Sequence, residues 1–159
     1  MLDLIFAIKF VHVLAAAVML GTWFTLAAFV LLAHRSGNPS VVALTAQFVV
    51  TLEKRIMITA LALQPIAGFP LASVIGVQPF GELWIVLSLL LYAVIVVGWF
   101  AALRIEMRIR DVARDAALNS QRLPKDYRRL FRNWCTLAGP ILIGMVLVFA
   151  LMIWQPRFD

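Results

Sequence analysis

Cysteine, histidine and charged residues are all scarce in this 159-residue sequence. The single cysteine, Cys135, excludes an intrachain disulfide and any cysteine-rich metal site. The motifs His-Glu-x-x-His, Cys-x-x-Cys, Gly-x-Ser-x-Gly and a glycine-rich phosphate loop are absent, so no zincin, dithiol, hydrolase or nucleotide chemistry is indicated. Only 14% of the residues are charged, against about 25% in an average soluble domain. These absences together argue against an ordinary soluble enzyme.

Apolar residues are what the sequence has in excess, at 64% of the chain with a mean hydropathy of +0.97. A helix needs about 20 mostly apolar residues to cross the hydrocarbon core of a bilayer. Four stretches qualify, at about 4–33, 56–77, 84–103 and 135–154. The first has no basic leader and is too long for a signal peptide, so we expect it to be a span. We therefore predict one all-α integral membrane domain over residues 1–159, an antiparallel bundle of four transmembrane helices.

The basic residues are strongly sorted between the connections. Twelve of the fourteen lie near the first or third connection, the second connection has none, and only Lys9 and Arg157 lie toward the other side. The positive-inside rule then places connections one and three in the cytoplasm and both termini outside, in a bacterial inner (plasma) membrane. The net charge of +6 thus indicates orientation rather than nucleic-acid binding. Trp84 and Trp154 are expected at the outer interface, and Trp134 at the inner one.

The helices are expected to extend beyond the apolar spans on the cytoplasmic side. The turn-forming cluster Ser36-Gly-Asn-Pro-Ser40 predicts that the second helix begins near Pro39. Helical spacing of apolar residues after Leu103 predicts that the third helix continues past the membrane. Pro124 suits the first turn of the fourth helix.

Lys9 and His12 are ionisable residues inside the first apolar stretch, where such side chains are expensive to place. His12 lies about 12 Å below the start of the span, and His34 lies about 33 Å further along the same helix. The two histidines of one chain therefore cannot share a metal or a haem. His12 is either hydrogen-bonded to a neighbouring helix or acts as a haem ligand or proton carrier. Lys9 either extends to the surface or meets an anionic group such as a porphyrin propionate.

Polar and sulfur-containing side chains on the other three helices are expected near the depth of His12. Helical rise places Tyr92 level with it, Ser88 one turn above it, Met145 within about a turn, and Gln64 at mid-membrane. Pro65 follows Gln64 and should free the carbonyl of Leu61. We predict that these residues can line one cavity in the outer half with His12 as its metal ligand, although ordinary packing is the favoured explanation for Tyr92 and Met145 taken singly.

Other polar residues are expected to have no role at membrane depth. Glu53, Glu82 and Glu106 lie just beyond the span ends, which argues against a carboxylate-driven proton pump. His34 is expected to be an interfacial residue without a function. Small residues that permit close helix approach include Gly21, Gly68, Gly139 and Gly144.

The order of these features resembles a family of bacterial integral membrane proteins described only as a domain of unknown function. The resemblance runs the length of the chain and rests on a set of short segments: Lys9-x-x-His12, the Gly21 region, "LQPIAGFPLA" around Gln64, "WIVLSLLLY" from Trp84 to Tyr92, "RIEMRIRDVARDA", "LPKDYRRLFRNW" and "LMIWQP". It implies a four-helix membrane protein and carries no activity.

A more distant resemblance is to HemJ-type protoporphyrinogen IX oxidases, small helical membrane proteins that bind haem b. The counterparts here are Lys9-x-x-His12, His34 at the end of the first helix, Leu52-Glu-Lys-Arg-Ile56, Phe131-Arg-Asn133 and Gln155-Pro156. The sequence departs from that family at Ser88, which stands where HemJ-type proteins have an essential lysine, and it lacks their Tyr-His. The resemblance therefore implies haem binding through His12 more than it implies porphyrinogen oxidation.

Three functions remain open from the sequence. The first is a haem b-binding membrane protein in electron transfer or in quinone- or porphyrin-linked oxidation, with His12 as axial ligand. The second is a non-catalytic accessory or scaffold subunit of a larger membrane complex, or a homodimer. The third is a small-solute or metal transporter, in which Pro65 and Pro140 break helices inside the membrane. Whether the protein is an enzyme is left open.

Overall fold

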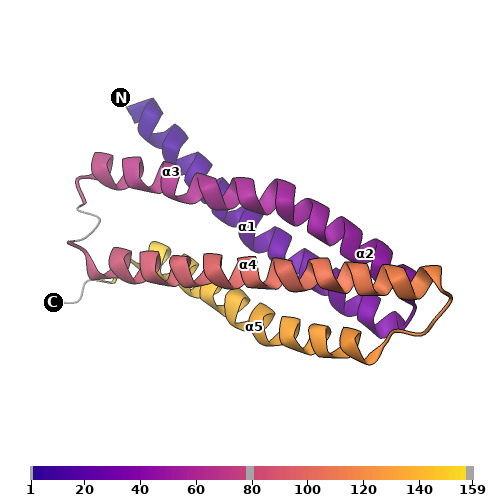
Figure 1. Cartoon of the computed structure of the whole chain (residues 1–159). Helices are drawn as coiled ribbons and strands as arrows, with labels where there is room; N and C mark the ends of the chain where they lie inside the picture. The colour runs from indigo at the N-terminus through magenta and orange to yellow at the C-terminus, as the bar shows by residue number, and fades with distance from the viewer. Residues whose placement is uncertain (1, 78–80, 157–159) are drawn as a thin grey trace.

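The chain forms four long helices, as the sequence predicts. The computed structural model describes residues 2–77 and 81–156, and those residues contain no β-strand. The elements are α1 (Leu2–Ser36), α2 (Pro39–Leu52), the π-helical turn η1 (Glu53–Met57), α3 (Ile58–Ile75), α4 (Leu83–Leu118) and α5 (Lys125–Trp154). The segments α2, η1 and α3 run on as one continuous helix, so the fold is an all-α bundle of four helices (Figure 1). Each of the four is long and apolar enough to cross a membrane, which confirms the predicted fold class.

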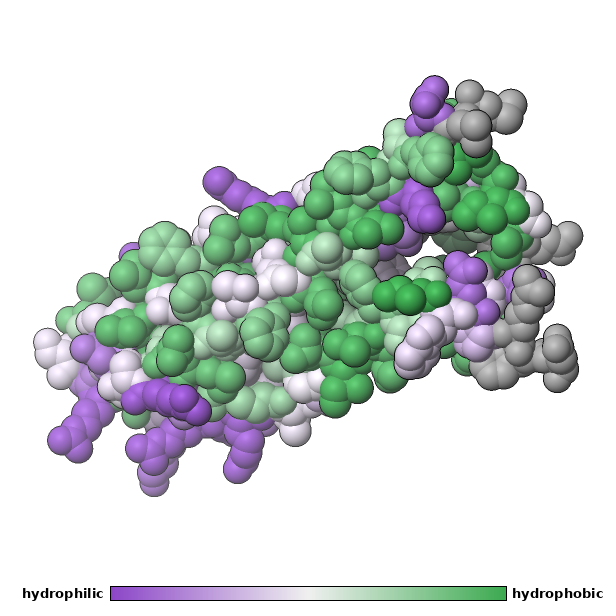
Figure 2. Space-filling model, turned by 180° about the vertical axis from the view of Figure 1, so that it is seen from behind, coloured by the Kyte–Doolittle hydropathy of each residue, from purple (hydrophilic) through white to green (hydrophobic). Residues whose placement is uncertain are grey.

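The helices are antiparallel and define two ends of the bundle (Figure 1). The terminal end holds the start of α1, the end of α3, the start of α4 and the end of α5. The basic end holds the connections at 37–38 and 119–124, where the arginine-rich turns of α4 and α5 lie. Figure 2 shows the hydrophilic side chains gathered at the basic end and a mainly hydrophobic surface over the middle. An apolar belt with polar ends is the surface expected of a bundle surrounded by lipid.

The helix ends at the basic end follow local chemistry. The Asn38 side chain accepts a hydrogen bond from the backbone N–H of Ser40 at 2.9 Å, and Pro39 occupies the first helical position. The predicted start of the second helix near Pro39 and the extension of α4 past Leu103 are both confirmed. Pro124 is the residue before α5 rather than a member of its first turn, a correction of one position.

The core is built where α4 packs against α5 and α2, and where α1 packs against α3. Trp23, Trp99 and Trp134 are nearly inaccessible, at 1%, 0% and 2% exposed. The expectation that Trp134 anchors the inner interface is therefore wrong, because its ring lies inside the bundle. Pro65 and Pro140 also lie within unbroken helices, which removes the helix breaks on which the transporter hypothesis depended.

Two of the glycines predicted to mark close approach do so. A Cβ atom on Gly68 would lie 3.1 Å from Cε1 of His12, and one on Gly144 would lie 3.1 Å from Cγ1 of Ile95. Gly21 and Gly139 have no such neighbour within 4 Å among the described residues. The helices therefore approach each other closely between α4 and α5 and between α1 and α3.

The close approach at Gly144 predicts a strong effect of size. Gly144→Leu should lower the free energy of unfolding by about 1–3 kcal/mol, because the side chain would overpack against Ile95. Gly139→Leu, one and a half turns earlier on α5, is the matched control and should change it by less than about 0.5 kcal/mol. Thermal unfolding of the detergent-solubilised variants measures both, and equal losses would contradict the packing described here.

Candidate functional site

A cavity of about 260 Å³ opens between α1, α3, α4 and α5 near the terminal end. Figure 2 shows the molecular surface hollowed near this end, with hydrophilic side chains beside the opening. Of the residues predicted to line a common cavity, His12, Gln64, Ser88 and Tyr92 do so, and Lys9 lines it as well. The lining is otherwise mainly apolar. The volume lies just below the range of about 300–1,000 Å³ typical of small-molecule sites.

His12 is the most informative side chain on this cavity. Its imidazole is half-buried, and Nδ1 is buried beside the backbone of Gln64 without a hydrogen bond of good geometry among the described residues. The ring packs against Gly68 of α3, where a Cβ atom would lie 3.1 Å from Cε1 of the ring and force it to shift. The contact with the α3 backbone is compatible both with the packing alternative and with ligation through the other ring nitrogen.

Gln64 of α3 contacts both the imidazole and the backbone of His12. Nε2 of Gln64 donates to the backbone carbonyl of His12 at 3.3 Å, which joins α3 to α1. Ser88 bonds back to the carbonyl of Trp84 at 2.8 Å on its own helix. Lys9 is exposed on the lining, so its ammonium group is available to an anionic part of a ligand.

Pro65 leaves the carbonyl of Leu61 without its usual helical donor, and Tyr92 supplies one. The Tyr92 hydroxyl donates to this carbonyl at 2.6 Å. A proline has no N–H for the carbonyl four residues earlier, and lipid offers no water in its place. Tyr92 is thus both part of the cavity wall and the tie between α4 and α3.

Met145 is the one predicted site residue that the structure keeps out of the cavity. It is 0% exposed and belongs to the packed core, whereas Met152 and Gln155 line the cavity instead. Two features explain the difference. α1 crosses the other helices obliquely (Figure 1), so equal counts from the helix ends do not give equal depth. The contact between Gly144 and Ile95 also closes α5 onto α4 at this point.

The residues on the cavity fit one-sided ligation of a haem. His12 offers the ring nitrogen that does not face α3, Gly68 leaves its ring room, and Lys9 is placed for a carboxylate. The Tyr92 hydroxyl is committed to Leu61, and Met152 is the other lining side chain of a type that ligates haem iron. No group of three or more His, Cys, Asp or Glu side chains that could hold a metal ion occurs among the described residues.

Two glutamates that sequence reasoning placed at the membrane edges are buried in the bundle instead. Glu53 is 1% exposed and Glu106 is 3% exposed, and Nε1 of Trp134 donates to Oε1 of Glu106 at 2.7 Å. Both helices extend past the expected spans, so protein rather than water surrounds these carboxyl groups. The signal available in the sequence was the position of Glu53 and Glu106 on the apolar faces of helices expected to extend beyond the spans.

His34 also makes specific contacts that were not expected. Its Nδ1 lies 2.9 Å from the Tyr127 hydroxyl, and its ring stacks on Phe131 with centroids 3.6 Å apart. These contacts fasten the end of α1 to the start of α5. The expectation that His34 has no role is therefore wrong for the packing of the basic end.

The bond between Tyr92 and Leu61 gives a testable double-mutant cycle. Tyr92→Phe should lower the free energy of unfolding by about 1 kcal/mol, because the carbonyl freed by Pro65 loses its donor. In a Pro65→Ala background the loss should largely vanish, since the alanine restores a backbone N–H for Leu61. Unfolding in detergent measures all four proteins, and the same loss in both backgrounds would refute the assignment.

Comparison with known proteins agrees with this membrane architecture. No curated protein and no solved structure matches the chain. A family model does match residues 6–156, nearly the whole chain, and its description is "predicted integral membrane protein (DUF2269)". The protein is therefore a member of the DUF2269 family of integral membrane proteins.

Proposed function

We propose that the cavity at the terminal end binds a flat, largely apolar redox molecule, with haem b as the first candidate and His12 as its axial ligand. The observation that carries this proposal is a half-buried imidazole on the wall of a cavity of about 260 Å³, with Nδ1 packed against α3 and no hydrogen bond to Nε2 among the described residues. An imidazole whose one nitrogen lies beside a backbone carbonyl presents the other nitrogen as the ligating atom. The resemblance to HemJ-type proteins at Lys9 and His12 supports the same assignment.

The chain's own residues would bind and orient such a molecule. His12 supplies the ligating nitrogen, and Lys9 on the exposed rim pairs with a carboxylate of the ligand. The bonds of Gln64 to His12 and of Tyr92 to Leu61 hold α1, α3 and α4 at fixed spacing around it. A bound haem would supply one-electron chemistry. Because Ser88 stands where HemJ-type proteins have their essential lysine, we favour electron transfer over porphyrinogen oxidation.

The absorption spectrum of the purified protein tests the proposal. Protein from cells supplied with haem precursors should show a Soret band and a reduced-minus-oxidised difference spectrum of the b type. His12→Ala should abolish both signals, because the cavity has no other imidazole. Gly68→Leu should reduce haem content severalfold with His12 still present, since the added side chain competes with the imidazole for space.

His34→Ala is the matched control, because it removes the other histidine of the chain without touching the cavity. Its spectrum should equal that of the wild type. A colourless wild-type protein that also fails to bind added hemin, or an unchanged spectrum in His12→Ala, would remove the haem assignment. An accessory subunit would then be the better account, and a second protein should be retained in gentle detergent.

We further propose that the basic end faces the cytoplasm of a bacterium and the cavity faces the outer side of its plasma membrane. Arginine and lysine side chains gather at the basic end, and cytoplasmic connections carry such an excess. Single cysteines introduced in a Cys135→Ala background test the proposal with a membrane-impermeant maleimide. Gly81→Cys, exposed at the terminal end, should react in spheroplasts, whereas Gln121→Cys, exposed at the basic end, should react only after the membrane is opened. The reverse pattern would invert the topology.

A further inference from the structure

The two buried glutamates form a second polar region, distinct from the cavity at the terminal end. Glu53 lies in the π-helical turn of the long helix, and Glu106 lies on the facing side of α4. Each carboxyl group lies within hydrogen-bonding reach of the other. They are the only acidic or basic side chains that are buried among the described residues. The burial of these two side chains is a property of the fold and does not depend on whether His12 binds a ligand.

Most of the carboxylate oxygens of this pair have no hydrogen-bond donor. Oε1 of Glu106 accepts from Trp134, but Oε2 of Glu106 and both oxygens of Glu53 are buried without a partner among the described residues. Trp99 lies beside Glu53, yet its Nε1 is also without a bond of good geometry. The described part of the chain therefore provides no donor for three acceptor atoms that lie in one place.

The pair also lacks a compensating positive charge. The ion pairs within the described residues join Arg110 to Asp111 and Arg129 to Asp126, away from this site. Lys54 and Arg55, which follow Glu53, are exposed. Across the nearby cavity the groups that face Glu106 are the Thr45 and Tyr127 hydroxyls among apolar side chains. Two adjacent carboxylates that are buried without a cation repel each other and cannot both stay ionised.

We propose that Glu53 and Glu106 form a proton-binding site, in which the two carboxyl groups share one exchangeable proton. A proton between them supplies the missing donor, because the protonated carboxyl donates its O–H to an oxygen of the other. It also removes one of the two negative charges. The π-helical turn supports this role, because the N–H of Ile58 bonds five residues back to the carbonyl of Glu53 and keeps Glu53 and Met57 on the buried face. Such turns are frequent at functional sites.

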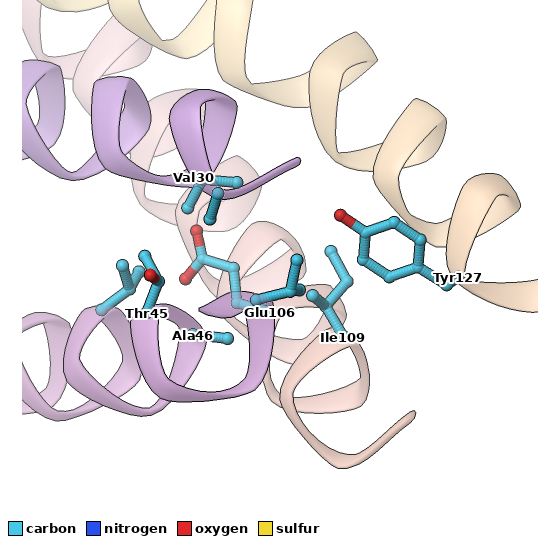
Figure 3. A pocket seen from close by; sticks show the side chains of 9 residues that line it. Val30, Thr45, Ala46, Glu106, Ile109 and Tyr127 are labelled. Carbon is cyan, nitrogen blue, oxygen red and sulfur yellow. The ribbon is translucent and has the colours of Figure 1, made fainter. Parts of the chain in front are cut away.

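A route for exchange with the solution leads toward the basic end. A cavity of about 10 Å³, room for roughly one water, adjoins Glu106. Figure 3 shows the Glu106 carboxylate between Val30 of α1 and Thr45 of α2, with the Tyr127 hydroxyl turned toward the same space. That hydroxyl is bonded to His34, which is partly exposed. A hydronium ion that reaches this cavity can give its proton to a carboxylate oxygen and leave as water, and the reverse step releases it.

Infrared spectroscopy of the full-length protein in nanodiscs tests this site directly. At pH 7 a solvated glutamate is ionised, so a carboxylic acid C=O band at this pH reports a protonated buried carboxyl group. The wild type should show such a band with an intensity of about one group per chain, and the band should shift when the sample is moved into D₂O. Glu53→Gln should abolish it, because the new amide can donate to Glu106 and lets that carboxylate stay ionised.

The controls separate a proton site from a structural contact. Glu82→Gln should leave the band unchanged, since Glu82 is not buried. The double variant Glu53→Gln/Glu106→Gln should lack the band and still show the wild-type helical circular dichroism, which excludes misfolding as the reason. Absence of the band in the wild type, its persistence in the double variant, or a band that never shifts in D₂O would each overturn the proposal.

Discussion

The hydrogen bond from Tyr92 to the carbonyl of Leu61 repairs the backbone of the long helix inside the bundle and joins that helix to α4. Pro65 takes away the helical donor of that carbonyl, and in lipid the loss has to be repaired by protein. This hydrogen bond holds α4 against the long helix Pro39–Ile75 at a level between the cavity and the glutamate pair. On the side of this bond toward the terminal end, α1 diverges from the other helices and the cavity stays open. On the side toward the basic end, the buried tryptophans close the core around Glu53 and Glu106.

The excess length of the helices explains how two acids are buried without facing lipid. The long helix from Pro39 to Ile75 has 37 residues and α4 has 36, so each is about 55 Å long. A hydrocarbon core is about 30 Å thick. The bundle therefore continues well beyond it, and its core at the basic end is enclosed by protein. Helical length is what converts glutamates at the edge of an apolar stretch into interior groups.

The sequence predicts the parts of this structure that follow from periodicity and hydropathy. Four helices, the start at Pro39 and the extension of α4 needed only local rules, and the shared cavity needed only depth counted along helices. Rotation and tilt are not encoded in a count of residues. Met145 was therefore placed in the cavity instead of Met152, Trp134 was placed at an interface, and Glu53 and Glu106 were placed at the membrane edges. A π-helical turn shifts the buried face by one residue, and helical periodicity in the sequence does not reveal it.

Buried apolar residues lie along the helices between the two polar regions: Met57 and Leu61 between Glu53 and Gln64, and Trp99 between Tyr92 and Glu106. Gln64, which bonds to His12, and Glu53 are eleven residues apart on one helix, or about 16 Å. A unit charge that appears at the cavity acts on the glutamate pair across this distance with an energy on the order of 1 kcal/mol at an effective dielectric constant of about 20. That energy changes a proton affinity roughly fivefold. Electrostatics alone is thus sufficient to link a change of charge at one end of the bundle to proton occupancy near the other.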